Sequence, residues 1–270
     1  MSCPDCFRGG AATGTPSGSY EQLHGYKTYI AKPGSTTSKS NIILYTDAFG
    51  HQLPNNLLIA DALSQQLAAT VLVPDIIPGG PMSPAILPLM DTFTSPTSSY
   101  VSKALAMARA MVYVIPFFAR AAPQKPASTV PCEQFARAVR QDAGEEAKLG
   151  LVGYCWGGFQ ALHLAGLRGA KLADAVFIAH PAKYEPQHVR LAVENGVPVS
   201  FAHAALDMSL PTAKIDETRT LMDGKEGFEL SVYEGCVHGF AVRATPGKEK
   251  EAEAADQALQ QAVTWFKRWL

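Results

Sequence analysis

The chain has 270 residues, of which 47% are hydrophobic, and a formal net charge of -1. A neutral chain of this length and composition is typical of a globular protein with one large core, and it lacks the basic excess that nucleic-acid binding requires. The most apolar stretch, from Ala104 to Ala122, contains Arg109, Arg120 and Pro116. It therefore predicts a helix of the domain rather than a membrane span.

The number of cysteines and the N-terminal residues predict the cellular compartment in which the protein resides. Five cysteines, an odd number, argue against a disulfide framework and for reducing surroundings. The first residues lack the charged and apolar regions of a signal peptide, so we expect a cytoplasmic protein. Cys3 and Cys6 form a C-x-x-C pair, but no second ligand pair follows at zinc-finger spacing. We expect free surface thiols there, with no metal and no organic cofactor.

The first part of the chain predicts an arm and then the start of a sheet. Residues 1–19 are rich in Gly, Ser, Thr and Pro, and we expect an arm lying over a single domain of residues 20–270. Residues 26–31 alternate in the manner of an edge strand, whereas 41–46 form the continuous apolar run of a strand covered on both faces. A helix over 54–69 and a buried strand over 70–75 follow.

The remaining elements repeat this alternation of strands and helices. Residues 76–96 are rich in Pro and Gly, and their length suggests a cap or loop over a site. The pattern then predicts helices over about 98–121, 131–147, 210–222 and 249–270, and strands before residue 155 and over 173–179, 197–202 and 228–233. Such a rhythm predicts an α/β fold with a mainly parallel central sheet and helices on both faces.

The predicted organisation of the chain centres on a strand–turn–helix stretch that contains Cys155. The sequence Gly153-Tyr154-Cys155-Trp156-Gly157-Gly158 has the pattern of a nucleophile elbow, G-x-S-x-G, with Cys in place of Ser. Glycines two residues to either side remove side chains that would collide with the neighbouring strand and helix. The helix that begins directly after Cys155 favours a thiolate. The alternative is a buried cysteine in a turn without catalytic function.

Two downstream residues complete a catalytic triad in the expected order. A cysteine nucleophile needs a base and an acid that orients the base, and this fold supplies them in the order nucleophile, carboxylate, histidine. Asp207 and His238 each follow a predicted strand, so they lie at the same edge of the sheet as Cys155. Taken singly, each is equally consistent with an ordinary loop residue. The rival histidines are His163, His180 and His203, of which His180 ends the strand after the elbow.

An oxyanion hole is expected beside this triad. One donor would be the backbone N–H of Trp156, and the second would come from the loop Asp47-Ala48-Phe49-Gly50, with Phe49 as the preferred residue. These donors face the point where negative charge develops during acyl transfer.

These motifs together resemble the dienelactone hydrolase family, from about residue 20 to the end. They are the elbow, the strands that end in Asp47-Ala48-Phe49-Gly50 and Val73-Pro74-Asp75, Asp207, and His238-Gly239-Phe240. The N-terminal residues 2–9 resemble the fungal branch. The resemblance implies an α/β-hydrolase fold and a Cys155–His238–Asp207 triad.

The resemblance also draws attention to Asp47 and Arg243. Bacterial members carry a glutamate at the position of Asp47 that holds the resting thiol and helps to activate it; the alternative here is that Asp47 braces its own loop. They also bind a substrate carboxylate with two arginines, one of them four residues after the histidine. Arg243 is five residues after His238, so it is either a substrate-binding residue or a surface arginine.

The sequence therefore predicts a hydrolase that cleaves a lactone or carboxylic ester through an acyl-enzyme at Cys155. We expect a small-molecule substrate, no nucleic-acid or membrane partner, and a monomer or homodimer. The alternatives are a thioesterase or polyketide-product hydrolase of the same fold, and a small-molecule binding protein that retains the fold without turnover. The charged C-terminal helix allows an interaction role, although such a pattern is usually a solvated face.

Overall fold

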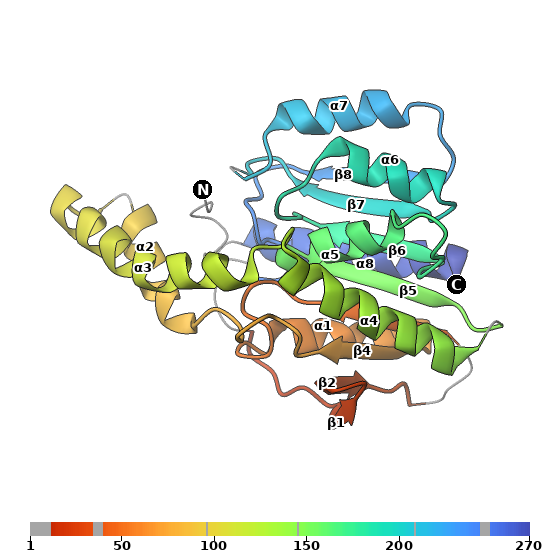
Figure 1. Ribbon diagram of the computed structural model, residues 1–270. Coiled ribbons are helices and arrows are strands. Elements are labelled where there is room, and N and C mark those ends of the chain that lie inside the picture. Colours follow the sequence, from red (N-terminus) through yellow and green to blue (C-terminus); the bar gives the residue numbers. More distant parts are fainter. Residues whose placement is uncertain (1–11, 35–39, 96, 145, 208, 244–248) are drawn as a thin grey trace.

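The computed structural model describes residues 12–34, 40–95, 97–144, 146–207, 209–243 and 249–270. Cys3 and Cys6 lie outside these residues, as does most of the predicted N-terminal arm. Within the described ranges the chain forms one eight-stranded sheet with helices on both faces (Figure 1).

The sheet has the order β1-β2-β4-β3-β5-β6-β7-β8. β1 pairs antiparallel with β2, and β2 pairs antiparallel with β4, whereas all the other pairs are parallel. The predicted fold class, a mainly parallel sheet of the α/β-hydrolase type, is therefore confirmed. The strands are β1 (Ser19–Leu23), β2 (Tyr26–Ala31), β3 (Asn41–Tyr45), β4 (Thr70–Pro74), β5 (Leu149–Tyr154), β6 (Ala175–Ala179), β7 (Val199–Ala204) and β8 (Phe228–Tyr233).

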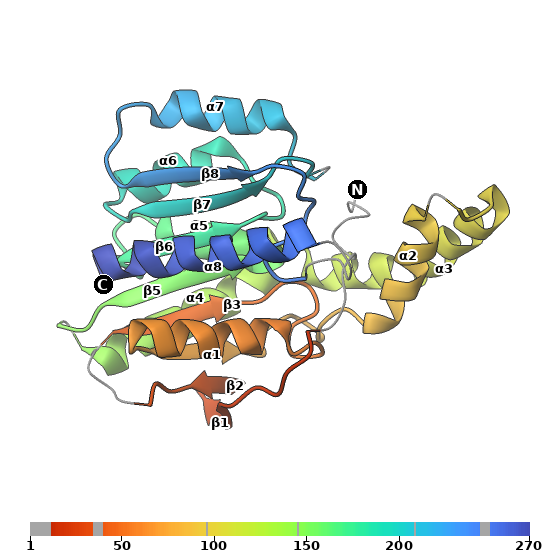
Figure 2. The same ribbon diagram turned by 180° about the vertical axis from the view of Figure 1, so that it is seen from behind.

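The central strands are apolar on both faces because helices cover both. Ile43 and Leu151 contribute to the core on one face, and Leu44 and Val152 contribute to the core on the other. Figure 2 shows the helices over the second face, and Figure 1 shows those over the first. The second face carries α1 (Asn55–Leu67) and α8 (Glu249–Trp269), and the first carries α4 (Pro126–Ala143), α5 (Trp156–Ala165), α6 (Pro186–Glu194) and α7 (Thr212–Met222).

Two helices project from this α/β body. Helix α2 (Leu87–Thr94) packs against α3 (Tyr100–Ala121), and together they extend away from the sheet (Figures 1 and 2). The base of α3 is held by Arg120, whose Nε donates to the Pro78 carbonyl at 3.1 Å and whose Nη2 donates to the Gly80 carbonyl at 3.0 Å. Within residues 76–96, for which we expected a cap or loop, Pro84–Ile86 form a short 3₁₀ helix and Leu87–Thr94 form α2, neither of which was predicted. Prolines at the first positions of short helices are compatible with helix, because their missing N–H would be unpaired there.

Helix α3 exposes much of its apolar surface. Within the described parts of the chain it is the one helix long and apolar enough, by length and composition, to cross a membrane. Its most apolar window has a mean hydropathy of 1.4, yet only 22% of that window is buried. Val101, Val112 and Ile115 are 78%, 69% and 63% exposed. The bounds agree with the predicted helix over 98–121, but most of its surface lies outside the core.

Three further differences concern weak sequence signals. β1 was not predicted, because its side chains are largely exposed and give no alternation; a tight turn at His24 and Gly25, both with positive φ, pairs it with β2. Helix α6 was not predicted. Helix α4 begins and ends earlier than the predicted 131–147, with Pro126 at its first position.

Candidate active site

Cys155 lies in a strained turn between β5 and α5. Its φ of 50° and ψ of -109° are rare for a residue with a side chain, and such strain persists only where the surroundings hold it. The Cys155 N–H donates to the Ala179 carbonyl at 3.2 Å, and the Cys155 carbonyl accepts from the Ala182 N–H at 2.8 Å. On the β3 side, the Gly157 N–H donates to the Thr46 carbonyl at 3.0 Å. The turn is thereby fixed to both neighbouring strands.

The glycines around Cys155 have the steric role that the sequence predicts. A Cβ added at Gly153 would collide with the Gly157 carbonyl, and one added at Gly157 would collide with the Tyr45 carbonyl. A Cβ at Gly158 would come within 2.8 Å of the Pro181 Cβ. Only glycine allows strand β3, the turn and helix α5 to approach this closely.

Asp207 and His238 form a buried pair at the same edge of the sheet. Asp207 follows β7 and His238 follows β8, and the Asp207 Oδ2 lies 2.8 Å from the His238 Nδ1. Both side chains are 0% exposed. Burial alone raises the pKa of Asp207, but the charge of His238 and hydrogen bonds from His238 and Ser209 outweigh it and hold that pKa well below its usual value. The carboxylate therefore stays ionised and fixes the imidazole ring.

Sequence reasoning missed Ser209, which joins this pair. Its Oγ donates to the Asp207 Oδ1 at 2.6 Å and lies 2.8 Å from the His238 Nδ1. Its N–H also donates to the Asp207 Oδ1, at 2.9 Å. The bond from the Ser209 N–H makes an Asx turn, in which an aspartate accepts from the backbone two residues on, and this spacing is the signal that would have pointed to Ser209.

His180, a rival base in the sequence, lies beside the pair without a carboxylate of its own. Its ring centroid is 4.8 Å from that of His238, and its backbone φ is 37°. Neither ring nitrogen meets a hydrogen-bond partner from another described residue. Burial, and then the charge of a protonated His238, hold the pKa of His180 well below the ordinary 6.5. His180 is therefore a neutral wall of the site, whereas His238 has the carboxylate that a general base requires.

Asp47 braces the loop after β3. Its Oδ1 accepts from the Phe49 N–H at 3.0 Å and from the Asn56 Nδ2 at 3.0 Å, and its Oδ2 forms an ion pair with Arg243. The Arg243 guanidinium also lies 4.8 Å from the centre of the Phe49 ring. These contacts agree with the interpretation that Asp47 braces its own loop, rather than with the one in which it holds the thiol.

The same contacts change the interpretation of Arg243 and Phe49. Arg243 is only 2% exposed, so the reading as a surface arginine is wrong. The Phe49 N–H, expected as an oxyanion donor, is engaged by the Asp47 carboxylate. Asn55 closes this group of residues by donating from Nδ2 to the Val242 carbonyl at 2.9 Å. The loops after β3 and β8 are thus tied together through buried polar side chains that the sequence pattern did not reveal.

Trp156 occupies the first position of α5, where the backbone N–H has no partner within the helix. Its indole Nε1 donates to the Ala121 carbonyl at 2.8 Å, which joins the start of α5 to the end of α3. Within the described residues, no three His, Cys, Asp or Glu side chains converge as a metal site would require.

Comparisons with known proteins agree with this architecture. The family model described as "Dienelactone hydrolase family" matches residues 26–270. "Hydrolase pyvD" of Aspergillus violaceofuscus is 26% identical and covers 98% of this chain and 96% of its own. "Dienlactone hydrolase 1" of Gibberella moniliformis is 26% identical over 98% of this chain and 93% of its own.

Solved structures show the same fold. A putative dienelactone hydrolase from Klebsiella pneumoniae superposes with a TM-score of 0.59 at 17% identity and covers 90% of this chain and 93% of its own. A propionate-bound esterase from Thermogutta terrifontis superposes with a TM-score of 0.61 at 14% identity, over 94% of each chain.

Proposed function

The chain belongs to the dienelactone hydrolase family, and from that membership we propose that it hydrolyses a lactone or carboxylic ester through a covalent acyl-enzyme at Cys155. The buried pair of Asp207 and His238 supports this proposal most strongly, because it lies at the sheet edge where the strained turn carries Cys155. Strain held by several backbone hydrogen bonds is characteristic of functional turns.

The reaction proceeds in two halves. His238 takes the proton of the Cys155 thiol, and the sulfur attacks the carbonyl carbon of the substrate. The carbonyl π electrons move to oxygen and return as the bond to the leaving alkoxide breaks, and His238 gives its proton to that alkoxide. His238 then takes a proton from water, the hydroxide attacks the thioester, and the carboxylate product leaves while the thiol is restored. Asp207, anionic throughout, orients the imidazole.

The oxyanion would be stabilised by the Trp156 N–H at the start of α5 and by the Phe49 N–H. In this structure the Asp47 carboxylate engages the Phe49 N–H, so the second donor becomes available only when Asp47 releases it. An anionic substrate group that pairs with Arg243 would compete with Asp47 for the guanidinium and favour that release. We therefore propose that a carboxylate-bearing lactone is a better substrate than its neutral methyl ester.

A panel of lactones and aryl esters, measured with three histidine variants, tests the proposal. His238→Ala is expected to lose most activity, whereas His163→Ala is the control, since His163 stacks on Phe159 in α5 away from the pair. His180→Ala is expected to retain more activity than His238→Ala. Wild-type rates in His238→Ala would overturn the proposed base, and loss confined to His180→Ala would transfer the role to His180.

A further inference from the structure

An apolar groove runs along one side of α3 toward the body of the protein. Its α3 wall is a stripe of side chains that recur every three or four residues, and Gln124 and Lys183 also line the groove. Its volume is about 680 Å³, within the range of small-molecule sites. The stripe consists of Met111, Val114, Ile115, Phe118, Ala119 and Ala122.

Both walls of the groove are attached to the nucleophile turn. On the α3 side, the Ala121 carbonyl accepts from the Trp156 Nε1 at 2.8 Å, and the Pro123 carbonyl accepts from the Gln160 Nε2 at 2.9 Å. On the other side, the Ala182 N–H donates to the Cys155 carbonyl at 2.8 Å, and Lys183 follows directly. The inner end of the groove is therefore beside the turn that carries Cys155.

Lys183 is the one charged side chain among the described lining residues. Its backbone φ is 54°, an uncommon value for a residue with a side chain, and it directly follows Ala182, whose N–H donates to the Cys155 carbonyl. An apolar wall that ends in a single cation is complementary to an amphipathic molecule with an apolar chain and an anionic end.

We propose that this groove binds the apolar chain of the substrate, so that the enzyme prefers lactones or esters with an extended alkyl or aryl part, and that Lys183 pairs with an anionic group such as the product carboxylate. This inference rests on the proposed function, because the groove is assigned to the substrate of Cys155. The hydrogen bonds that attach the groove to the nucleophile turn favour a substrate chain over a second protein or a lipid surface, neither of which would need an end near Cys155.

Binding without catalysis is measured first. Calorimetric titration of Cys155→Ala with hexanoate, octanoate and decanoate is expected to show affinity rising about two- to fourfold per methylene. Ala119→Trp, added in that background, fills the groove and is expected to abolish this rise. Val112→Trp is the matched control, because Val112 is an exposed α3 residue outside the groove. Ile115→Ser provides a second groove variant if Ala119→Trp does not fold.

Lys183→Gln is expected to weaken all three carboxylates by about the same factor, about three- to tenfold, and to leave the dependence on chain length unchanged. Lys225→Gln, at an exposed position outside the groove, is the control. Affinity independent of chain length, or equal behaviour of the Ala119→Trp and Val112→Trp variants, would overturn the inference.

Turnover separates the inference from the proposed function. Two series of esters are used, one with a growing acyl chain on p-nitrophenol and one with a growing alkyl group on acetate. Ala119→Trp is expected to lower kcat/KM for the long members of at least one series and to spare the short members. If carboxylate affinity rises with chain length but the wild type hydrolyses none of the esters, the proposed function is rejected and the groove stands as a binding site. Hydrolysis with neither series affected would keep the function and reject the groove.

Discussion

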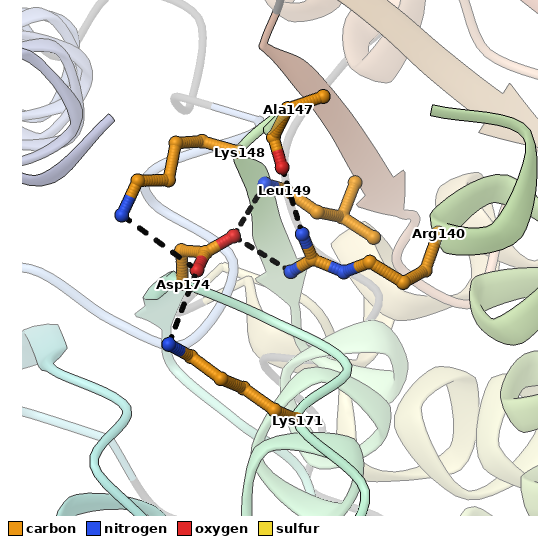
Figure 3. A network of polar contacts seen from close by, with 6 residues as sticks. All are labelled: Arg140, Ala147, Lys148, Leu149, Lys171 and Asp174. Carbon is orange, nitrogen blue, oxygen red and sulfur yellow. Dashed lines mark hydrogen bonds and ion pairs between the residues drawn. The ribbon is translucent and has the colours of Figure 1, made fainter. Parts of the chain in front are cut away.

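A polar cluster lies at each end of strand β5; one consists of ion pairs and hydrogen bonds between elements of the fold, and the other contains the proposed catalytic residues. At the amino end, Asp174 lies just before β6 and accepts from the Arg140 Nη2 at 2.6 Å and from the Leu149 N–H at 2.8 Å (Figure 3). Lys148 and Lys171 approach the other carboxylate oxygen at 3.9 and 3.8 Å. At the carboxyl end are Cys155, His180 and the pair of Asp207 and His238.

Both clusters contain a carboxylate with a lowered pKa, but the backbone around them differs. Burial raises the pKa of Asp174, and the Leu149 N–H and Arg140 outweigh it, so the result has the same direction as for Asp207. Five described residues other than glycine have a positive φ, and three of them, Cys155, His180 and Lys183, follow β5 or β6 at the carboxyl edge. Three of these five residues therefore lie where we place the chemistry, whereas Ala68, just before β4, lies at the opposite edge of the sheet.

The comparison separates residues that stabilise the fold from residues that serve the reaction. Around Asp174, the contacts with Arg140 and with the Leu149 N–H join the start of β6 to α4 and to β5. Around Asp207, the contacts orient one imidazole ring beside a strained nucleophile. Substitutions at the carboxyl end of β5 should therefore lower kcat, whereas substitutions at the amino end should leave kcat unchanged.

The largest expected effect is at Cys155. Cys155→Ala should reduce kcat/KM by at least about 10⁴-fold, because the nucleophile is lost, and Cys155→Ser should leave little activity, since a hydroxyl is far less ionised than a thiol. Cys132→Ala, at a buried cysteine of α4, is the control and should retain wild-type kcat/KM. Cys155→Gly should be about 1 kcal/mol more stable to urea than Cys155→Ala, because glycine relieves the positive φ. Equal stability would contradict the assigned strain.

The two buried aspartates provide a direct contrast. Asp207→Asn should lower kcat of the folded enzyme about 10³- to 10⁴-fold through a misoriented imidazole, and it should also lower the free energy of unfolding, because the folded state stabilises the ionised carboxylate. Asp174→Asn should leave kcat unchanged and lower the free energy of unfolding by about 1–3 kcal/mol, because charge-assisted hydrogen bonds are weakened. Steady-state kinetics and urea titration of both variants measure the contrast. The comparison fails if Asp174→Asn impairs kcat as strongly as Asp207→Asn does.

The main effect of Arg243→Ala should be a loss in the free energy of unfolding. The pair with Asp47 is buried, and removing one partner leaves an uncompensated charge, so we expect a loss of about 3–5 kcal/mol. Arg137→Ala removes an ion pair whose arginine is half exposed, and it should cost no more than about 1 kcal/mol. Urea unfolding measures both variants. A small cost at Arg243 would show that the pair with Asp47 does not brace the two loops.

The smallest expected effect is a dependence on pH at the amino end. The folded pKa of Asp174 is depressed below its ordinary 3.8, so between the two values the unfolded chain binds the extra proton. The stabilisation from Asp174 is therefore fully present above pH 3.8 and is lost as the pH falls through the folded pKa. The difference in unfolding free energy between the wild type and Asp174→Asn should shrink below about pH 4. A constant difference across this range would contradict the assigned pKa.

The sequence predicted what depends on strand order and local sterics. Asp207, His238 and Cys155 each follow a strand of a parallel sheet, and parallel strands bring their carboxyl ends to one edge. The glycines at positions 153 and 157 predicted the close approach of the turn to its neighbours, because only the absence of a Cβ permits it.

The sequence could not predict contacts between distant side chains. The ion pair of Asp47 with Arg243 joins the loops after β3 and β8, and neither loop has a periodicity that reveals its partner. Helix α2 was missed because prolines such as Pro84 and Pro88 indicate a loop, although both stand at the first positions of short helices, where proline is tolerated. The groove on α3 was missed because an apolar stripe in the sequence predicts a helix face that packs against the core. Whether that face is packed or lines a groove depends on the tertiary structure.

Trapping of the acyl-enzyme tests the central claim most directly. The protein is mixed with a slowly hydrolysed p-nitrophenyl ester, quenched in acid during turnover, and examined by intact mass and peptide mapping. We predict a mass increase equal to the acyl group on the peptide that contains Cys155, removable by hydroxylamine as a thioester, and absent from Cys155→Ala. An adduct on Cys132 or Cys236 instead, or turnover without any adduct at Cys155, would contradict the account.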